Sequence, residues 1–239
     1  DLKCKRVLFS LPRLIKYLKV ERPNILFTSQ MHSSIVALWA TKLAGVSTQV
    51  FIRQPTMLNP SYEEKSWKSK LVQKILLWSV KSAVEVIVTS KAMAKEFIDF
   101  SKIEQNKVEV IYNPVPIEFI REQSLEPLSH PWFKSNEPPV ILAVGRLVTV
   151  KDFQTLVKAF ALVRNETPAR LMILGEGPLR IELENLIDQL GLSDHVQMPG
   201  FVSNPYQYMK YSKVFVLSSL WEGFPNGMVE AMACGTAIV

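Results

Sequence analysis

Two basic residues follow a predicted buried strand in the second half of the chain. Residues 140–144 form an apolar, β-branched run, and the loop after it carries Gly145, Arg146 and Lys151 just before a predicted helix. In open parallel sheets, ligands bind beyond the carboxyl ends of the strands, so both cations emerge where a ligand would lie. Two cations at this position favour an anionic ligand such as a diphosphate.

A second loop, at residues 218–230, follows another predicted strand and opens a helix near Asn226. Its glycines and proline allow the backbone to approach a ligand closely. Amide groups at such a helix start bind anions, and a diphosphate that bridges these amides to the two cations would satisfy both. Glu222 and Glu230 flank that phosphate position, where we expect them to accept hydrogen bonds from sugar hydroxyls.

These loops are positioned by strands and helices that alternate along the whole chain. Residues 113–139 interrupt the alternation with six of the fifteen prolines. Strands that are apolar throughout are typical of parallel sheets covered on both faces. The expected strands are 24–28, 49–52, 84–89, 108–112, 140–144, 171–174, 195–198 and 214–217, and the expected helices are 33–43, 67–81, 92–100, 152–164, 178–190 and 226–233.

The alternation predicts an α/β fold of two Rossmann-like parallel-sheet domains. We expect an N-terminal domain at residues 1–121, a linker at 122–138 and a C-terminal domain at 139–239. Residues 1–136 hold 20 Lys and Arg against 12 Asp and Glu, whereas the remaining residues hold 8 against 10. A basic half joined to a near-neutral half indicates two domains with different partners.

The composition excludes several classes of protein. At 48% hydrophobic and 21% charged residues, the chain is globular rather than disordered. We expect neither a membrane span nor a signal peptide. Two cysteines, Cys4 and Cys234, are too few for a disulfide framework, which favours a cytoplasmic location, and Cys234 is predicted to be a small core residue. No metal-ligand spacing occurs, so we expect no metal and no cofactor.

In the order of its motifs, the chain resembles the family 4 retaining glycosyltransferases, which have the GT-B fold. The resemblance covers nearly all of residues 108–239, whereas residues 1–107 match the acceptor domain of the family only in their strand and helix rhythm. Both domains are expected to be incomplete, with the chain truncated at both ends. The matching motifs are Gly145-Arg146 with Lys151, Leu174-Gly-Glu-Gly-Pro-Leu-Arg180, Leu190-Gly-Leu192, Pro199-Gly-Phe-Val202 and Glu222-Gly-Phe-Pro-Asn-Gly-Met-Val-Glu230-Ala-Met-Ala-Cys-Gly235.

The resemblance implies that the two domains face each other across a cleft and that the protein moves a hexose-type sugar from a nucleotide sugar to a hydroxyl of a glycan or lipid-linked acceptor. By the same resemblance, the transfer would proceed with retention of configuration. It would need no metal, because cations and helix amides neutralise the leaving phosphate. The pathway would be surface polysaccharide or lipid-linked glycan synthesis. The implied catalytic residues are Arg146, Lys151 and Glu222, and the implied nucleotide-sugar-binding residues are Gly145, Arg146, Lys151, Glu222, Phe224, Asn226, Gly227 and Glu230.

Within that set, the resemblance assigns the diphosphate to Arg146 and Lys151, the ribose to Glu230 and the donor sugar to Glu222. Arg53-Gln54 stand where the family commonly has a histidine. His32 follows a predicted strand near the cleft, where a structural and a catalytic role both stay open.

Other functions stay open as hypotheses. A GT-B isomerase or phosphorylase, and an inactive module that only binds a nucleotide sugar, are compatible with the same fold, since sites rather than folds carry function. Leu174-Gly-Glu-Gly-Pro lacks the third glycine of a dinucleotide fingerprint, which argues against NAD binding.

Residues 65–81 form a predicted basic amphipathic helix with two tryptophans. Such helices favour anionic bilayer surfaces, so a peripheral location on the cytoplasmic face of a membrane is one interpretation. The alternative is that the apolar face of this helix packs on the sheet. Nucleic acid is not an expected partner, since the chain shows no recognition motif.

Overall fold

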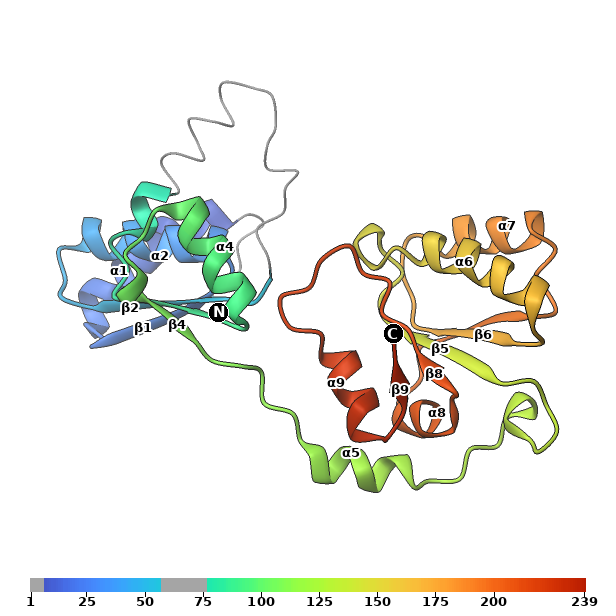
Figure 1. The fold of residues 1–239 in the computed structure, drawn as a ribbon. Helices are drawn as coiled ribbons and strands as arrows, with labels where there is room; N and C mark the ends of the chain where they lie inside the picture. The colour runs from blue at the N-terminus through green and yellow to red at the C-terminus, as the bar shows by residue number, and fades with distance from the viewer. Residues whose placement is uncertain (1–6, 57–76) are drawn as a thin grey trace. The chain divides into compact units, whose positions relative to one another are not determined.

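The computed structural model describes residues 7–56 and 77–239, which form two compact units that divide between Asn113 and Pro114 (Figure 1). Each unit contains one parallel sheet, with the strand orders β1-β2-β3-β4 and β7-β6-β5-β8-β9. The prediction of two parallel α/β domains is therefore confirmed.

The first unit packs its helices on one face of its sheet. Val50, Ile52 and Val86 form a buried cluster with residues of α2 and α4. Side chains alternate along a strand, so Phe27, at 56% exposure, and Arg53 lie on the other face. The elements of this unit are η1 (Val7–Ser10), α1 (Leu11–Glu21), β1 (Ile25–Ser29), α2 (Met31–Ala44), β2 (Gln49–Gln54), β3 (Glu85–Val88), α4 (Lys91–Ser101), η3 (Gln105–Lys107) and β4 (Val108–Val110).

The second unit has helices on both faces of its sheet (Figure 1). Leu171 and Ile173 of β6 pack toward α6 and α7, whereas Met172 and Leu174 pack in the cluster that includes residues of α8 and α9. The elements are α5 (Ile117–Ser124), η4 (Pro131–Phe133), β5 (Val140–Val144), η5 (Thr149–Lys151), α6 (Phe153–Glu166), β6 (Arg170–Leu174), α7 (Arg180–Gln189), β7 (Val196–Gly200), α8 (Tyr206–Tyr211), β8 (Val214–Phe215), α9 (Asn226–Ala233) and β9 (Ala237–Ile238). The four apolar residues at positions 171–174 of β6 are buried on both faces of the strand, so this strand contributes to two core layers at once.

Local sequence signals explain where several helices begin and end. The Ser90 side chain accepts a hydrogen bond from the Met93 amide at 3.2 Å and caps α4. Asp152 caps α6 in the same way, through the Thr155 amide at 3.4 Å. Helix α2 ends at Gly45, whose φ of 66° suits a residue without a side chain.

The proline-rich segment packs on the second unit instead of standing apart from both. Helix α5 contacts α8, with the rings of Phe119 and Tyr206 in an edge-to-face contact at 6.2 Å. The side-chain amide of Asn204 donates to the Gln123 carbonyl at 2.9 Å. Trp132 is buried in the cluster that contains Met172 and Leu174 together with residues of α8 and α9. Residues 114–138, which the sequence divided between a first domain ending at 121 and a linker at 122–138, therefore lie within the second unit because they carry apolar side chains that it buries.

The expected helix at residues 65–81 lies outside the described residues up to position 76. Its last turn, residues 77–80, is helical. No helix in the described ranges is both long enough and apolar enough to cross a lipid bilayer.

Two glycines allow the loop after β6 to pack against the loop after β5. A Cβ atom on Gly175, which has a φ of 139°, would lie 2.0 Å from the Gly145 carbonyl oxygen, and one on Gly177 would lie 2.4 Å from the Leu147 carbonyl oxygen. The Gly145 amide donates to the Leu174 carbonyl at 2.9 Å. The glycines of this segment thus serve backbone contact between two loops.

Replacement of Gly175 by alanine is expected to destabilise the second unit by about 3 kcal/mol or more, because the new methyl group adds a steric clash to a strained φ. Gly191→Ala is the matched control, since Gly191 also has a positive φ, of 67°, but open space around it. That control is expected to cost about 1 to 2 kcal/mol. Calorimetric unfolding of both variants checks the difference, and equal losses would contradict the proposed role of the close contact.

Candidate functional site

The predicted site residues lie at a topological switch point of the second sheet. The chain runs from β5 through β6 to β7 on one side, while β8 and β9 lie on the other side of β5. Strands β5 and β8 are parallel neighbours, so the loops after them open at one edge and lead away in opposite directions. Open α/β sheets bind ligands at such a point. These two loops carry Arg146, Lys151 and Glu222.

Lys151 and Glu222 form an ion pair that joins the two loops. The Lys151 Nζ lies 2.5 Å from the Glu222 Oε1, and each side chain is 24% exposed. The Ser219 hydroxyl donates to the same carboxylate oxygen at 2.7 Å. The sequence predicted separate roles for the two charged groups, and the structure brings them into direct contact.

Further hydrogen bonds hold the same loops together. The Ser218 hydroxyl donates to the Lys151 carbonyl at 2.7 Å, and the Leu220 amide donates to the Val150 carbonyl at 2.9 Å. Sequence reasoning assigned no role to Ser218 or Ser219. The available signal was a pair of small hydroxyl residues directly after a buried strand.

Gly145 provides the surface over which the Lys151 side chain runs. A Cβ atom at position 145 would lie 3.4 Å from both the Lys151 Cε and the Phe153 ring. Arg146, the next residue, is exposed, and within the described part of the chain its guanidinium has no hydrogen bond or ion pair. The loop therefore presents one fixed and one unpaired cation at the carboxyl edge of the sheet.

The start of α9 supplies a backbone donor at the same edge. The Asn226 amide donates to the Phe224 carbonyl at 2.9 Å, so this amide is already used within the turn. Of the backbone hydrogen bonds among the described residues, none involves the Gly227 amide. A Cβ atom on Gly227 would meet the Phe215 ring at 3.3 Å, so a glycine lets α9 approach β8 closely. Of the amides predicted to line the pocket, that of Asn226 is used within the turn and that of Gly227 is left for a ligand.

Glu230 is a half-buried carboxylate one turn into α9. Burial raises its pKa above the ordinary value for glutamate. No hydrogen bond or ion pair to its carboxylate occurs among the residues that the structure describes. A carboxylate that is desolvated without a partner costs folding free energy, and such groups concentrate at functional sites.

Two neighbours of Glu230 respond to its charge. Burial, and secondly the Glu230 carboxylate, raise the pKa of the Cys234 thiol to about 11. Burial, followed by the same carboxylate, also raises the pKa of the Tyr206 hydroxyl. Cys234 is partly buried beside the apolar cluster around Phe215, in keeping with its prediction as a small core residue.

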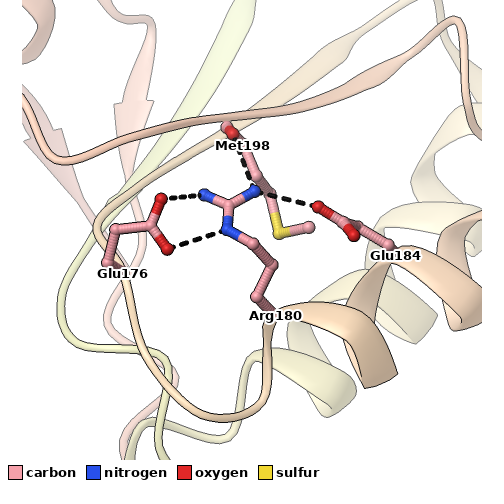
Figure 2. A network of polar contacts seen from close by, with 4 residues as sticks. All are labelled: Glu176, Arg180, Glu184 and Met198. Carbon is pink, nitrogen blue, oxygen red and sulfur yellow. Dashed lines mark hydrogen bonds and ion pairs between the residues drawn. The ribbon is translucent and has the colours of Figure 1, made fainter.

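Arg180 looks like a further cation for the site, but its donors are already used (Figure 2). Its guanidinium makes two hydrogen bonds to the Glu176 carboxylate, at 2.6 and 2.8 Å. It also donates to Glu184 at 2.9 Å and to the Met198 carbonyl at 3.2 Å. These contacts lower the pKa of Glu176 and raise that of Arg180. Arg180 therefore links the loop after β6 to β7 and serves the fold.

His32 belongs to the first unit. It is exposed in the first turn of α2, directly after β1. Across the described residues, no group of three or more His, Cys, Asp and Glu side chains is placed to hold a metal ion.

Comparison with known families gives two matches that together span nearly the whole chain. Residues 126–239 match the family described as glycosyl transferases group 1, and residues 1–119 match the one described as glycosyltransferase family 4.

Among characterised relatives, the chain is 32% identical to an N-acetylgalactosamine-N,N'-diacetylbacillosaminyl-diphospho-undecaprenol 4-alpha-N-acetylgalactosaminyltransferase of Campylobacter jejuni, over 100% of this chain and 60% of the relative. It is 30% identical to a UDP-Gal:alpha-D-GlcNAc-diphosphoundecaprenol alpha-1,3-galactosyltransferase of Escherichia coli, over 95% and 59%. Anabaena HepE in complex with UDP-glucose shares the GT-B fold, with a TM-score of 0.77 and 20% identity over 96% of this chain and 62% of that one. The chain thus spans about 60% of the length of these proteins.

The thiol of Cys234 is expected to report the charge on Glu230. Glu230→Gln removes a negative charge, so the pKa of Cys234 should fall below about 11 and its alkylation at pH 9 should become faster. Iodoacetamide kinetics in a Cys4→Ser background measure this rate. Glu222→Gln is the control and is expected to leave the rate unchanged, and an unchanged rate in Glu230→Gln as well would contradict the electrostatic contact.

Proposed function

The chain belongs to glycosyltransferase family 4, the group 1 glycosyl transferases, and from this premise we propose that the whole protein moves a sugar from a nucleoside diphosphate sugar to a hydroxyl of a glycan or lipid-linked acceptor. One observation carries the proposal. Two loops at the β5–β8 switch point are joined by the Lys151–Glu222 pair, and the loop that carries Lys151 also carries the Arg146 guanidinium, which has no ion pair within residues 7–56 and 77–239. This arrangement offers positive charge for a diphosphate and carboxylates for sugar hydroxyls.

The donor is proposed to bind with its diphosphate between Arg146, Lys151 and the Gly227 amide. Lys151 has three N–H donors, so it is able to contact phosphate while it keeps its bond to Glu222. The half-buried carboxylate of Glu230 would accept hydrogen bonds from the ribose hydroxyls, and Glu222 would contact the transferred sugar. The HepE structure, which contains UDP-glucose, supports a uridine nucleotide as the first donor to test.

The proposed reaction retains the configuration of a hexose-type sugar and needs no metal. Negative charge develops on the diphosphate as the bond to the sugar breaks. Arg146, Lys151 and the Gly227 amide would stabilise that charge without reorganisation, because the fold already holds them at one edge of the sheet. In this account Arg146, Lys151 and Glu222 are the catalytic residues.

The acceptor is proposed to be a glycan carried on a lipid diphosphate, used in surface polysaccharide or lipid-linked glycan synthesis. The names of the Campylobacter jejuni and Escherichia coli relatives both specify a diphospho-undecaprenol acceptor. The protein would then work at the cytoplasmic face of a membrane. Trp78, near the end of the basic segment at residues 65–81, supports this placement, since it is 64% exposed and the Lys42 ammonium lies 4.8 Å from its ring centroid.

Loss of either cation is expected to weaken binding of UDP. Lys151→Ala and Arg146→Ala each remove a charge-assisted contact, so each should cost about 1.5 to 3 kcal/mol of binding free energy. Lys158→Ala, at an exposed position of α6, is the control and should bind UDP normally. Titration calorimetry on the whole protein measures the affinities, and unchanged UDP affinity in both variants would refute the assigned phosphate site.

The two glutamates are expected to act at different steps. Glu230→Gln should weaken binding of UDP and of the UDP-sugar alike, because both contain the ribose. Glu222→Gln should chiefly lower kcat with the UDP-sugar. Product NMR with a diphospholipid acceptor measures turnover and shows whether the new bond keeps the anomeric configuration. Equal loss of UDP affinity in both variants would contradict the assignment, and an inverted product would contradict retention.

A further inference from the structure

Arg53 is a fixed guanidinium at the carboxyl end of β2 in the first unit. Its side chain is partly buried, and its Nη2 donates to the Asn113 Oδ1 at 2.8 Å. Asn113 lies beyond the end of β4, so this contact spans the end of the intervening strand β3. The alternation along β2 directs Arg53 away from the core beneath α2 and α4, which contains Ile52.

Arg53 has no counter-ion in the described part of the chain. The only hydrogen bond of its guanidinium there is to the neutral amide of Asn113, and no carboxylate there lies within ion-pair distance. A guanidinium carries five N–H donors, so most of them remain for a ligand. Partly burying a cation beside a neutral partner costs free energy that an anion at the same place would offset.

The backbone next to Arg53 is also arranged around this edge of the sheet. The Arg53 carbonyl accepts a hydrogen bond from the Gln30 amide at 3.1 Å. Gln30 has a φ of 71° and a ψ of 143°, a conformation that glutamine seldom adopts, and it directly precedes α2. The positive end of this 14-residue helix therefore lies at the same edge as the guanidinium.

A second unsatisfied group lies next to Arg53 in the sequence. Gln54 is 5% exposed, and its Oε1 has no hydrogen-bond partner among the residues that the structure describes, although its Nε2 donates to the Thr56 carbonyl at 2.8 Å. Because side chains alternate along β2, Gln54 lies on the same face as the core residues Val50 and Ile52, opposite Arg53, so it does not belong to the anion site.

We propose that Arg53 binds a phosphate group of the acceptor, so that the acceptor is a glycosyl phosphate or diphosphate. Asn113 acts as a positioning residue that holds the guanidinium at the sheet edge. This inference rests on the proposed function, because it assigns the acceptor's phosphate to the first unit and the donor's diphosphate to the second. A guanidinium recognises phosphate through two parallel N–H···O bonds, which an ammonium at the same place does not reproduce.

The experiment measures binding of glucose 1-phosphate to the whole protein by calorimetry, with methyl α-glucoside as the probe that lacks a phosphate. Arg53→Gln is expected to raise the Kd for glucose 1-phosphate about 10- to 100-fold. Arg53→Lys should restore only part of the affinity. Arg22→Gln is the matched control, since Arg22 is an exposed arginine at the opposite end of the same sheet, and it should bind normally.

Asn113→Ala tests the positioning role. It is expected to weaken binding when Arg53 is present and to have no further effect in the Arg53→Gln background. An equal effect of Asn113→Ala in both backgrounds would overturn that role. Circular dichroism of each variant shows that the fold is kept.

Lys151→Ala separates this inference from the proposed function. If Arg53→Gln loses glucose 1-phosphate and Lys151→Ala retains it, the phosphate site is in the first unit, whatever the outcome of the UDP titrations. If Lys151→Ala loses it and Arg53→Gln does not, the inference is overturned. The inference is also overturned if methyl α-glucoside binds as tightly as glucose 1-phosphate. It is overturned as well if Arg53→Gln changes only sedimentation with phosphatidylglycerol vesicles, since that result would identify a lipid headgroup as the ligand.

Discussion

Close contact between the backbones of neighbouring loops is the constraint on which the candidate site depends. Gly175 and Gly177 have no side chains, so the loop after β6 lies directly on the Gly145–Leu147 segment. This contact fixes the path of the loop after β5, and Gly145 in turn leaves room for the Lys151 stem. The Lys151–Glu222 pair then ties that loop to the one after β8. The positions of the charged side chains at the switch point thus depend on glycines, because only a residue without a side chain fits where the two loops touch.

The number of hydrogen-bond and ion-pair partners distinguishes arginines that stabilise the fold from arginines available to bind a ligand. Arg180 meets two carboxylates and a carbonyl oxygen, so its donors are used in holding the loop after β6 against β7. Arg146 has no partner in the described residues, and Arg53 has one neutral partner. A cation without a counter-ion costs free energy in the empty protein, and binding of an anion recovers it. Residue type alone does not distinguish these cases, because all three are arginines at or beyond the carboxyl end of a parallel strand.

Glu230 is a carboxylate whose burial costs folding stability, and binding of a ligand would recover that cost. Its pKa is raised by burial, so the unfolded chain releases its proton at lower pH than the folded chain does. The folded state therefore loses stability as the pH rises from the pKa of Glu230 in the unfolded chain to its pKa in the folded chain. The cost is fully present above the folded pKa, where a ligand with hydroxyl donors would reduce it. Helix α9 holds the group in place because its start is packed closely on β8 through Gly227.

The sequence by itself determined the elements and the kind of site. Apolar runs gave β5 with its observed bounds, the helical pattern gave α9, and the motif order indicated the family, because such signals are local and repeat along the chain. Tertiary structure alone decided that Lys151 meets Glu222, 71 positions away, and that Arg53 meets Asn113, 60 positions away. It also decided that residues 114–138 pack on the second unit. Such contacts depend on strand order, register and loop path, which are set when distant segments pack together, so no local pattern encodes them.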